Sequence, residues 1–477
     1  MGSAGNAALT AVRRRIAIRR RLATTPGRLW SASALLLIGA IVFGAVAADA
    51  ARTRRHAVRD IAATERLLVS AVDLSAILSD AHATAASSFL VGGPEPAASR
   101  IRYADLLRDA TDGVTRLAGE LGPSPAVRTI ARLLPVYAGL IERARANYRQ
   151  GFPVGSAYLR RASETRDEIL LQGRALYGIQ AMQLTESLRT GKRTSALRAV
   201  LLAGGAMLAL LAATQVYLAR TTRRLLNPGL ALATVLLLGL IGWLVLAFAA
   251  QQRALTQAQR NGTDPIELLT ATRILALRAQ AEESIALAAR GGGEGEPNLA
   301  DVDRGFEALT APIGNARADA ALGSGGLLHA AAEMAGPTAQ ARSAIDAIHR
   351  AYGTYVEAHE RVASCERVGN FDAAVELAVG RTARRTRATQ ARGDGRNCGP
   401  ADDPASTADD PVSTKRAAIV LNDRLEREVD AARARFDRST SRAESALAGL
   451  AVGAPVLTGL CALLGLLGVS RRLREYR

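Results

Sequence analysis

Two uncharged runs and the basic loop that joins them decide the fold class: AVLLAGGAMLALLAATQVYLA (199–219), RTTRRLLN (220–227) and PGLALATVLLLGLIGWLVLAFAA (228–250). Each run reaches the ~20 apolar residues that a helix needs to cross a bilayer. Helices in the core of a soluble protein rarely run this long without a charge. The pair is therefore predicted to be two transmembrane helices with a short connection.

Two further apolar runs, at 30–48 and 446–469, have the same character. Aromatic residues make up only 4% of the chain and Ala, Leu and Arg dominate it, so helix formers prevail over strand formers. The sequence predicts an all-α membrane protein with four transmembrane helices, embedded in membrane lipids.

The formal net charge of +17 is concentrated beside these runs. Residues 1–29 hold seven Arg and no acid, residues 219–227 hold three Arg and no acid, and residues 470–477 hold four Arg and one Glu. Basic residues that flank apolar spans mark the cytoplasmic side of a membrane. No basic stripe is interleaved with stacking aromatics, so nucleic acid is not an expected partner.

The basic loop sets the expected topology. Short basic loops stay inside, which places 220–227, the N-terminal segment 1–29 and the tail 470–477 in the cytoplasm. Residues 49–198 and 251–445 then lie outside, in a multi-pass protein of the cytoplasmic membrane. In this topology four Arg residues between 52 and 59 would lie outside, against the charge rule, but long translocated segments tolerate such charge. Cleavage after the small residues Ala45–Ala47 stays an alternative for the first span.

The two outer segments share one plan. VYAGLIERARANYRQGFPVGSAYLRRAS (136–163) parallels AYGTYVEAHERVASCERVGNFDAAVELAVG (351–380), and both carry apolar residues at helical spacing. Gly- and Pro-rich breakers, including NGTDP (261–265), divide the segments into helices. We expect two extracytoplasmic four-helix bundles arranged as a tandem repeat, in which Tyr137, Tyr352 and His359 pack in the cores.

An insertion at 381–414 departs from this plan. It is rich in Arg, Thr, Gly, Asp and Pro and has no apolar period, so an exposed loop is expected. Its acidic part lacks the spacing of a twelve-residue calcium loop. Cys365 and Cys398 both fall in the oxidising outer space, and we predict a disulfide between them.

Chemistry-bearing motifs are not apparent. The sequence has no phosphate-binding Gly loop, no nucleophile elbow and no Cys/His cluster, so we expect no cofactor, no metal and no enzymatic activity. The four spans lack interior acids and bases, which argues against an ion path. The predicted inner segments are too short for a catalytic domain, and a separate cytoplasmic protein is expected to read any signal.

The layout resembles the sensor region of bacterial chemoreceptors, which joins an outer four-helix bundle to two membrane helices. A closer resemblance lies in DAHATAASSFLVGGPEP (80–96), RIRYADLL (100–107) and RARANYRQGFPVGSAYLRRAS (143–163), which look like actinobacterial GlnX-type membrane proteins. That resemblance implies a relay: an extracytoplasmic solute-binding lipoprotein for glutamate, aspartate or glutamine docks outside, and a soluble Ser/Thr protein kinase responds inside.

Two sets of residues are candidates for these contacts. The turns near 92–96, 151–155 and 291–297 are expected at the exposed, membrane-distal tip, where partner-binding residues would be Arg100, Arg102, Tyr103, Asn147, Arg149 and Gln150. A solvated bundle tip explains the same residues. Cytoplasmic contacts would come from Arg220, Arg223, Arg224, Arg471, Arg472 and Arg474, which lipid anchoring also explains. An accessory subunit of a membrane transporter or an envelope scaffold is the alternative function.

Overall fold

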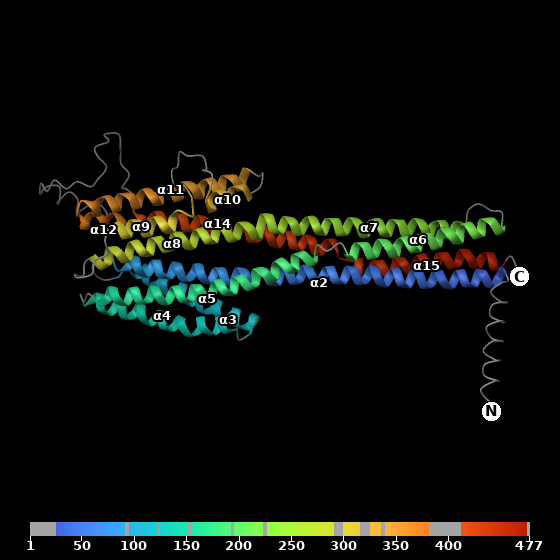
Figure 1. Cartoon of the computed structure of the whole chain (residues 1–477), viewed down its shortest axis with the longest axis horizontal. Coiled ribbons are helices and arrows are strands. Elements are labelled where there is room, and N and C mark those ends of the chain that lie inside the picture. Colours follow the sequence, from blue (N-terminus) through green and yellow to red (C-terminus); the bar gives the residue numbers. More distant parts are fainter. Residues whose placement is uncertain are drawn as a thin grey trace, which may run out of the picture. The chain divides into compact units, whose positions relative to one another are not determined.

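A computed structural model describes residues 25–90, 95–122, 124–150, 154–191, 195–222, 227–290, 299–314, 325–334, 339–380 and 412–474. Within these ranges the chain is almost entirely helical and contains no strand (Figure 1). Four helical stretches, which include residues 30–88, 196–220, 228–289 and 414–470, are long and apolar enough to cross a membrane. These features suggest a membrane protein.

The chain divides into two compact units. The first unit comprises residues 1–61, 186–256 and 439–477, and the second comprises residues 62–185 and 257–438. Helix α2 (Thr25–Ser88) is continuous from the apolar run at 30–48 into the first segment of the second unit, where it ends at Ser88. No Gly or Pro occurs between residues 45 and 88, which explains why the helix does not stop where the apolar run ends.

The first unit contains the start of α2, helix α6 (Ser195–Thr222), most of α7 (Pro228–Ala258) and helix α15 (Leu450–Arg474). Small residues let these helices approach closely. A Cβ added to Gly229 of α7 would lie 2.9 Å from the Cα of Gly468 of α15. The side-chain amide of Asn227 donates to the Gly468 carbonyl at 2.8 Å. Close crossings at small residues are typical of helices that pack in a membrane.

The Arg residues that follow the first apolar run have partners in the first unit. Arg54 donates to Gln251 at 2.8 Å, and its guanidinium lies 4.2 Å from the ring centroid of Phe248. Arg55 and Arg59 both pair with Glu444, at 3.3 and 3.0 Å. Three of the four Arg residues between 52 and 59 therefore have partners within the first unit.

In the second unit, the region before residue 186 is built from α2, α3 (Ala97–Leu121), α4 (Pro125–Arg149) and α5 (Val154–Gly191). Ser124 caps α4 by accepting from the Val127 N–H at 3.2 Å. Pro135 lies inside α4, and the helix continues through it. The expected core stripe is confirmed, because Ile130, Tyr137 and Ile141 are at most 1% exposed.

The region after residue 257 has more helices than the four expected. It contains α8 (Asp264–Arg290), α9 (Leu299–Thr310), α10 (Leu327–Met334), α11 (Ala339–Arg367), α12 (Phe371–Val379) and α14 (Thr414–Ala446). Tyr352 and His359 are buried, as expected, and Tyr355 is buried with them. The His359 Nδ1 lies 2.8 Å from Oε2 of Glu283. The prediction that this region simply repeats the first is not demonstrated by these helices.

The expected break at NGTDP is wrong. Residues 259–263 form a short π-helix, η1 (Gln259–Thr263), that joins α7 to α8 without a turn. The backbone of Gly262 lies against Phe436 of α14, where an added Cβ would be 2.7 Å from the Phe436 Cβ. The Arg435 Nε donates to the Asn261 carbonyl at 3.0 Å. A π-helix frees carbonyls from the normal ladder, and this contact satisfies one of them.

Candidate functional site

Helices α3 and α4 and the end of α2 enclose an open cavity of about 540 Å³, which we name the arginine cavity. Helix α3 lines it with Arg100, Tyr103, Ala104, Leu107, Arg108 and Thr111. These positions recur every three or four residues and therefore share one face of the helix. Helix α4 contributes its last two turns, with Glu142, Arg145, Tyr148 and Arg149.

Arg145 is the central cation of the arginine cavity. Its side chain is 9% exposed, and it pairs with Glu95 at 3.1 Å and with Glu142. Its guanidinium carbon lies 4.4 Å from the ring centroid of Tyr103, which is the distance of a cation–π contact. The Arg145 Nε is buried and has no hydrogen-bond partner among the described residues. One donor of this guanidinium is therefore left for another group.

Tyr103 forms part of the aromatic wall. Its ring is 3% exposed, and its hydroxyl is buried without a hydrogen-bond partner among the described residues. Burial raises the pKa of Tyr103, so the hydroxyl keeps its proton at neutral pH. Phe89 and Tyr148 complete the wall in an edge-to-face pair, with centroids 5.3 Å apart.

The charge of the arginine cavity is positive. Its lining includes four guanidinium groups, from Arg100, Arg108, Arg145 and Arg149, and two carboxylates, from Glu95 and Glu142, which leaves a surplus of two positive charges. Guanidinium groups beside aromatic rings can hold a carboxylate through charge-assisted hydrogen bonds. The arrangement suits an acidic group of a ligand or of a protein.

The predicted outer-tip residues do not all meet. Arg100, Tyr103 and Arg149 line the arginine cavity, whereas Arg102 points to Asp80 of α2, at 2.9 Å, and lines a different cavity. Asn147 donates its side-chain amide to the Arg143 carbonyl, and Gln150 ends α4 as its C-cap. These last two have local structural roles.

Sequence reasoning missed the residues that complete the cavity. Glu95, Arg108, Glu142 and Arg145 were not among the candidates, although they line it. The helical spacing from Arg100 to Arg108 is a usable signal, because residues eight apart share a helix face. Arg145 follows Ala144 of the buried stripe, and a charge beside a core position is a second signal.

Behind this cavity, the second unit buries a polar cluster around His82 of α2. The His82 Nε2 lies 2.7 Å from the Ser163 hydroxyl, and its Nδ1 lies 3.4 Å from the Tyr137 hydroxyl. Burial lowers the pKa of His82, and the nearby Arg166 and Arg278 lower it further, so the ring is neutral. The Nδ1 faces a tyrosine and not a carboxylate, which differs from a Ser-His-Asp arrangement.

Arg166 of α5 is fully buried and connects the region before residue 186 with the region after residue 257. It pairs with Asp167 at 2.8 Å and lies 3.6 Å from Glu282 of α8. Arg278 of α8 reaches back to Asp167 at 3.4 Å. Within the second unit, a charged network therefore joins α5 to α8. Among the described residues, no group of three or more His, Cys, Asp or Glu is placed to hold a metal ion.

The predicted cytoplasmic arginines are only partly described. Arg220 lies in the last turn of α6. The last turns of α15 include Arg471, Arg472 and Arg474. Arg223, Arg224 and Cys398 fall outside the described residues. Cys365 is disulfide-bonded, while the cytoplasmic contacts and the pairing of Cys365 with Cys398 stay predictions. Cys365 is buried near the end of α11.

The family model described as an actinobacterial sensor domain matches residues 57–189. This range contains the arginine cavity, the His82 cluster and Arg166. The match suggests a sensor role for the chain, and it is consistent with an actinobacterial sensor protein. Comparisons with curated proteins and with solved structures give no match.

Proposed function

We propose that this chain is a non-catalytic transmembrane sensor that passes an extracytoplasmic signal to a cytoplasmic partner. The observation that supports this best is the sensor-domain match over 57–189, in a chain with four helices able to span a membrane. Helix α2 enters the matched range without a break, and Ser88 in its last turn lines the arginine cavity. A group that binds there contacts the same helix that carries the first apolar run.

The proposed outer partner is a protein that presents acidic groups, and the resemblance to GlnX-type proteins favours a solute-binding lipoprotein that reports amino-acid availability. The arginine cavity supplies the matching chemistry, since its charge surplus is positive and Arg100 and Arg149 are exposed at its edge. Acidic side chains of the partner would dock on these two residues.

The proposed inner partner is a soluble Ser/Thr protein kinase, on the same resemblance. Small displacements of a helix along its axis are a known way to pass a signal across a membrane. A displacement of α2 by an ångström or two, set by the state of the outer partner, would then be read at the cytoplasmic ends of the spans.

A deletion strain tests the relay. Phosphorylation of the kinase's substrates is measured while external glutamate or aspartate is varied. Complementation with the wild type should restore the response, and complementation with an Arg100→Glu, Arg149→Glu variant should not. Arg128→Glu, on an exposed position of α4, is the matched control. An amino-acid response that persists in the deletion strain would overturn the relay and favour the accessory-subunit alternative.

A further inference from the structure

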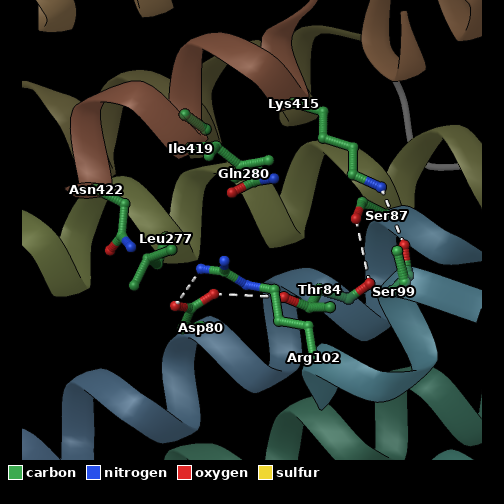
Figure 2. A pocket seen from close by; sticks show the side chains of 12 residues that line it. Asp80, Thr84, Ser87, Ser99, Arg102, Leu277, Gln280, Lys415, Ile419 and Asn422 are labelled. Carbon is green, nitrogen blue, oxygen red and sulfur yellow. Dashed lines mark hydrogen bonds and ion pairs between the residues drawn. The ribbon is translucent and has the colours of Figure 1, made fainter. Parts of the chain in front are cut away.

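A second cavity, of about 280 Å³, lies within the second unit where four helices meet (Figure 2). Helices α2 and α3 come from the region matched by the sensor-domain family, and α8 and α14 come from the later part of the chain. Side chains from all four point into the same space: Asp80, Ser99, Arg102, Gln280, Lys415 and Asn422. The volume suits a small metabolite and not a peptide.

Lys415 supplies a positive charge that this cavity does not neutralise. Its ammonium lies 3.5 Å from the Ser99 hydroxyl, and no carboxylate of the described residues is within ion-pairing distance of it. Burial lowers the pKa of Lys415, and Arg102 lowers it further while Glu95 opposes the shift. An anion beside Lys415 would relieve this cost of holding a partly buried charge.

Asp80 is already occupied by other partners. Its side chain is 6% exposed, and it accepts from Arg102 at 2.9 Å and from Thr84 at 3.3 Å, while Arg273 lies 3.8 Å away. A ligand cation would have to compete with two guanidinium groups for this carboxylate. The surplus charge of the site is therefore positive.

Asn422 leaves a free donor in the cavity wall. The residue is 3% exposed, and its Oδ1 accepts from the Arg273 Nε at 2.7 Å. That bond fixes which end of the amide is the oxygen, and the Nδ2 is buried without a hydrogen-bond partner among the described residues. A buried donor without a partner costs free energy, and a ligand acceptor would satisfy it.

Two helices also begin at this cavity. Ala98 and Ser99 lie in the first turn of α3, which has no side-chain cap. Lys415 lies in the first turn of α14, which Ser413 caps by accepting from the Arg416 N–H at 3.3 Å. The N-terminal end of a helix carries partial positive charge and favours an anion. This adds to the charge of Lys415 and to the free amide of Asn422.

We propose that this cavity binds a small organic carboxylate directly, with its carboxylate held by Lys415 and Arg102 and a second acceptor held by the Asn422 amide. The ligand would connect α2 and α3 to α8 and α14 and stabilise this arrangement of the second unit by mass action. The proposal does not rest on a lipoprotein or a kinase, because it concerns binding to the chain itself.

The test uses the full-length protein purified in detergent, with thermal shift and isothermal titration against acetate, pyruvate, succinate, glutamate and inorganic phosphate. At least one carboxylate should bind saturably and raise the melting temperature. Lys415→Gln and Asn422→Asp should weaken that binding by about tenfold or more, since each removes a donor to a charged group. Asn422→Asp keeps an acceptor for Arg273, so the fold should persist.

Arg416→Gln is the matched control, because Arg416 is the next residue of α14 and is exposed. It should bind as the wild type does. Arg108→Gln, in the arginine cavity, should also leave the affinity unchanged. Three results would overturn the proposal: no carboxylate binds the wild type, phosphate alone binds, or Lys415→Gln binds as tightly as the wild type. Loss of binding in Arg108→Gln alone would move the site to the arginine cavity.

Discussion

The guanidinium of Arg145 lies over the ring of Tyr103, 4.4 Å from its centroid, and pairs with Glu95 at 3.1 Å. Arg145→Met removes both contacts and leaves Glu95 as a mostly buried carboxylate without this partner. The second unit should lose about 2–3 kcal/mol of stability. Thermal unfolding followed by circular dichroism measures the change in melting temperature.

Arg143→Met is the control for that substitution, because Arg143 is exposed two positions earlier on α4 and should tolerate the change. Adding Glu95→Gln to Arg145→Met removes the uncompensated charge, so the double variant should be more stable than Arg145→Met alone. Equal stability of the single and double variants would contradict the pairing.

Glu65 of α2 should make the stability of the second unit depend on pH. Burial raises the pKa of Glu65 to about 7, and Asp437 adds to the shift, while Arg433 and Arg66 oppose it and Asp73 contributes further. The unfolded chain has the usual lower pKa for this carboxyl, so the folded form retains the proton to a higher pH. The stability that the protonated Glu65 contributes is fully present below about pH 4.5 and is lost as pH rises to about 7.

Glu65→Gln replaces the carboxyl group with an amide of similar shape that stays uncharged at every pH. The variant should therefore be more stable than the wild type at pH 8, by on the order of 3 kcal/mol, and the two should converge near pH 4.5. Melting temperatures across pH 4.5–8 give the comparison. Glu120→Gln, at an exposed position of α3, should follow the wild type. Parallel pH profiles for Glu65→Gln and the wild type would rule out this role.

The helical fold class and the four helices long and apolar enough to cross a membrane could be predicted from the sequence, since both depend on local composition and spacing. The burial of Tyr137 and Tyr352 followed from the same helical period. Arg166 could not be predicted, because its contact with Glu282 joins residues far apart in the chain. A charge on a helix is usually solvated, and only the packing of α5 against α8 shows that this one is fully buried.

The candidate site was predicted in part for the same reason. Arg100, Tyr103 and Arg149 were found because they flank predicted turns. Arg102 was grouped with them by proximity in sequence, yet it follows Arg100 by two positions on a helix and so faces elsewhere, toward Asp80. The π-helix was missed because Asn, Gly and Pro together usually end a helix, while here Gly262 makes room for Phe436.

Gly262→Ala should disturb the packing of η1. The new Cβ would lie 2.7 Å from the Phe436 Cβ and 3.1 Å from its Cα, and neither atom can move without the backbone of α14. Overpacking of this kind costs about 1–3 kcal/mol.

Gly139→Ala is the control, because nothing lies within 4 Å of its added Cβ inside α4. It should raise stability by about 0.5–1 kcal/mol. Thermal melts of both variants test the prediction, and a Gly262→Ala protein as stable as wild type would reject the close contact.

The predicted disulfide between Cys365 and Cys398 would close a loop of about 33 residues and contribute about 3–4 kcal/mol on loop-entropy grounds. Cys365 is fully buried beside Val362 and Ala374, and its sulfur is disulfide-bonded. Peptide mapping under denaturing, non-reducing conditions should therefore recover the two residues in one linked peptide. Cys461 of α15 is free and should be alkylated in the same experiment. Recovery of Cys365 and Cys398 as separate alkylated peptides would reject the bridge.

The expected orientation in the membrane rests on the basic loop at 220–227, and single-cysteine labelling of intact cells tests it. Ser343→Cys lies at an exposed position of α11 and Asp109→Cys at an exposed position of α3. Both should react with a membrane-impermeant reagent if the second unit faces outward. Thr222→Cys, beside the basic loop, should react only after the cells are opened, because Arg residues near a span favour the inner side.

The wild-type protein, with its native cysteines, gives the background. Labelling of Thr222→Cys in intact cells, or protection of Ser343→Cys and Asp109→Cys, would reverse the topology. The arginine cavity would then face the cytoplasm, where a solute-binding lipoprotein could not reach it, and the proposed direction of signalling would fail with it.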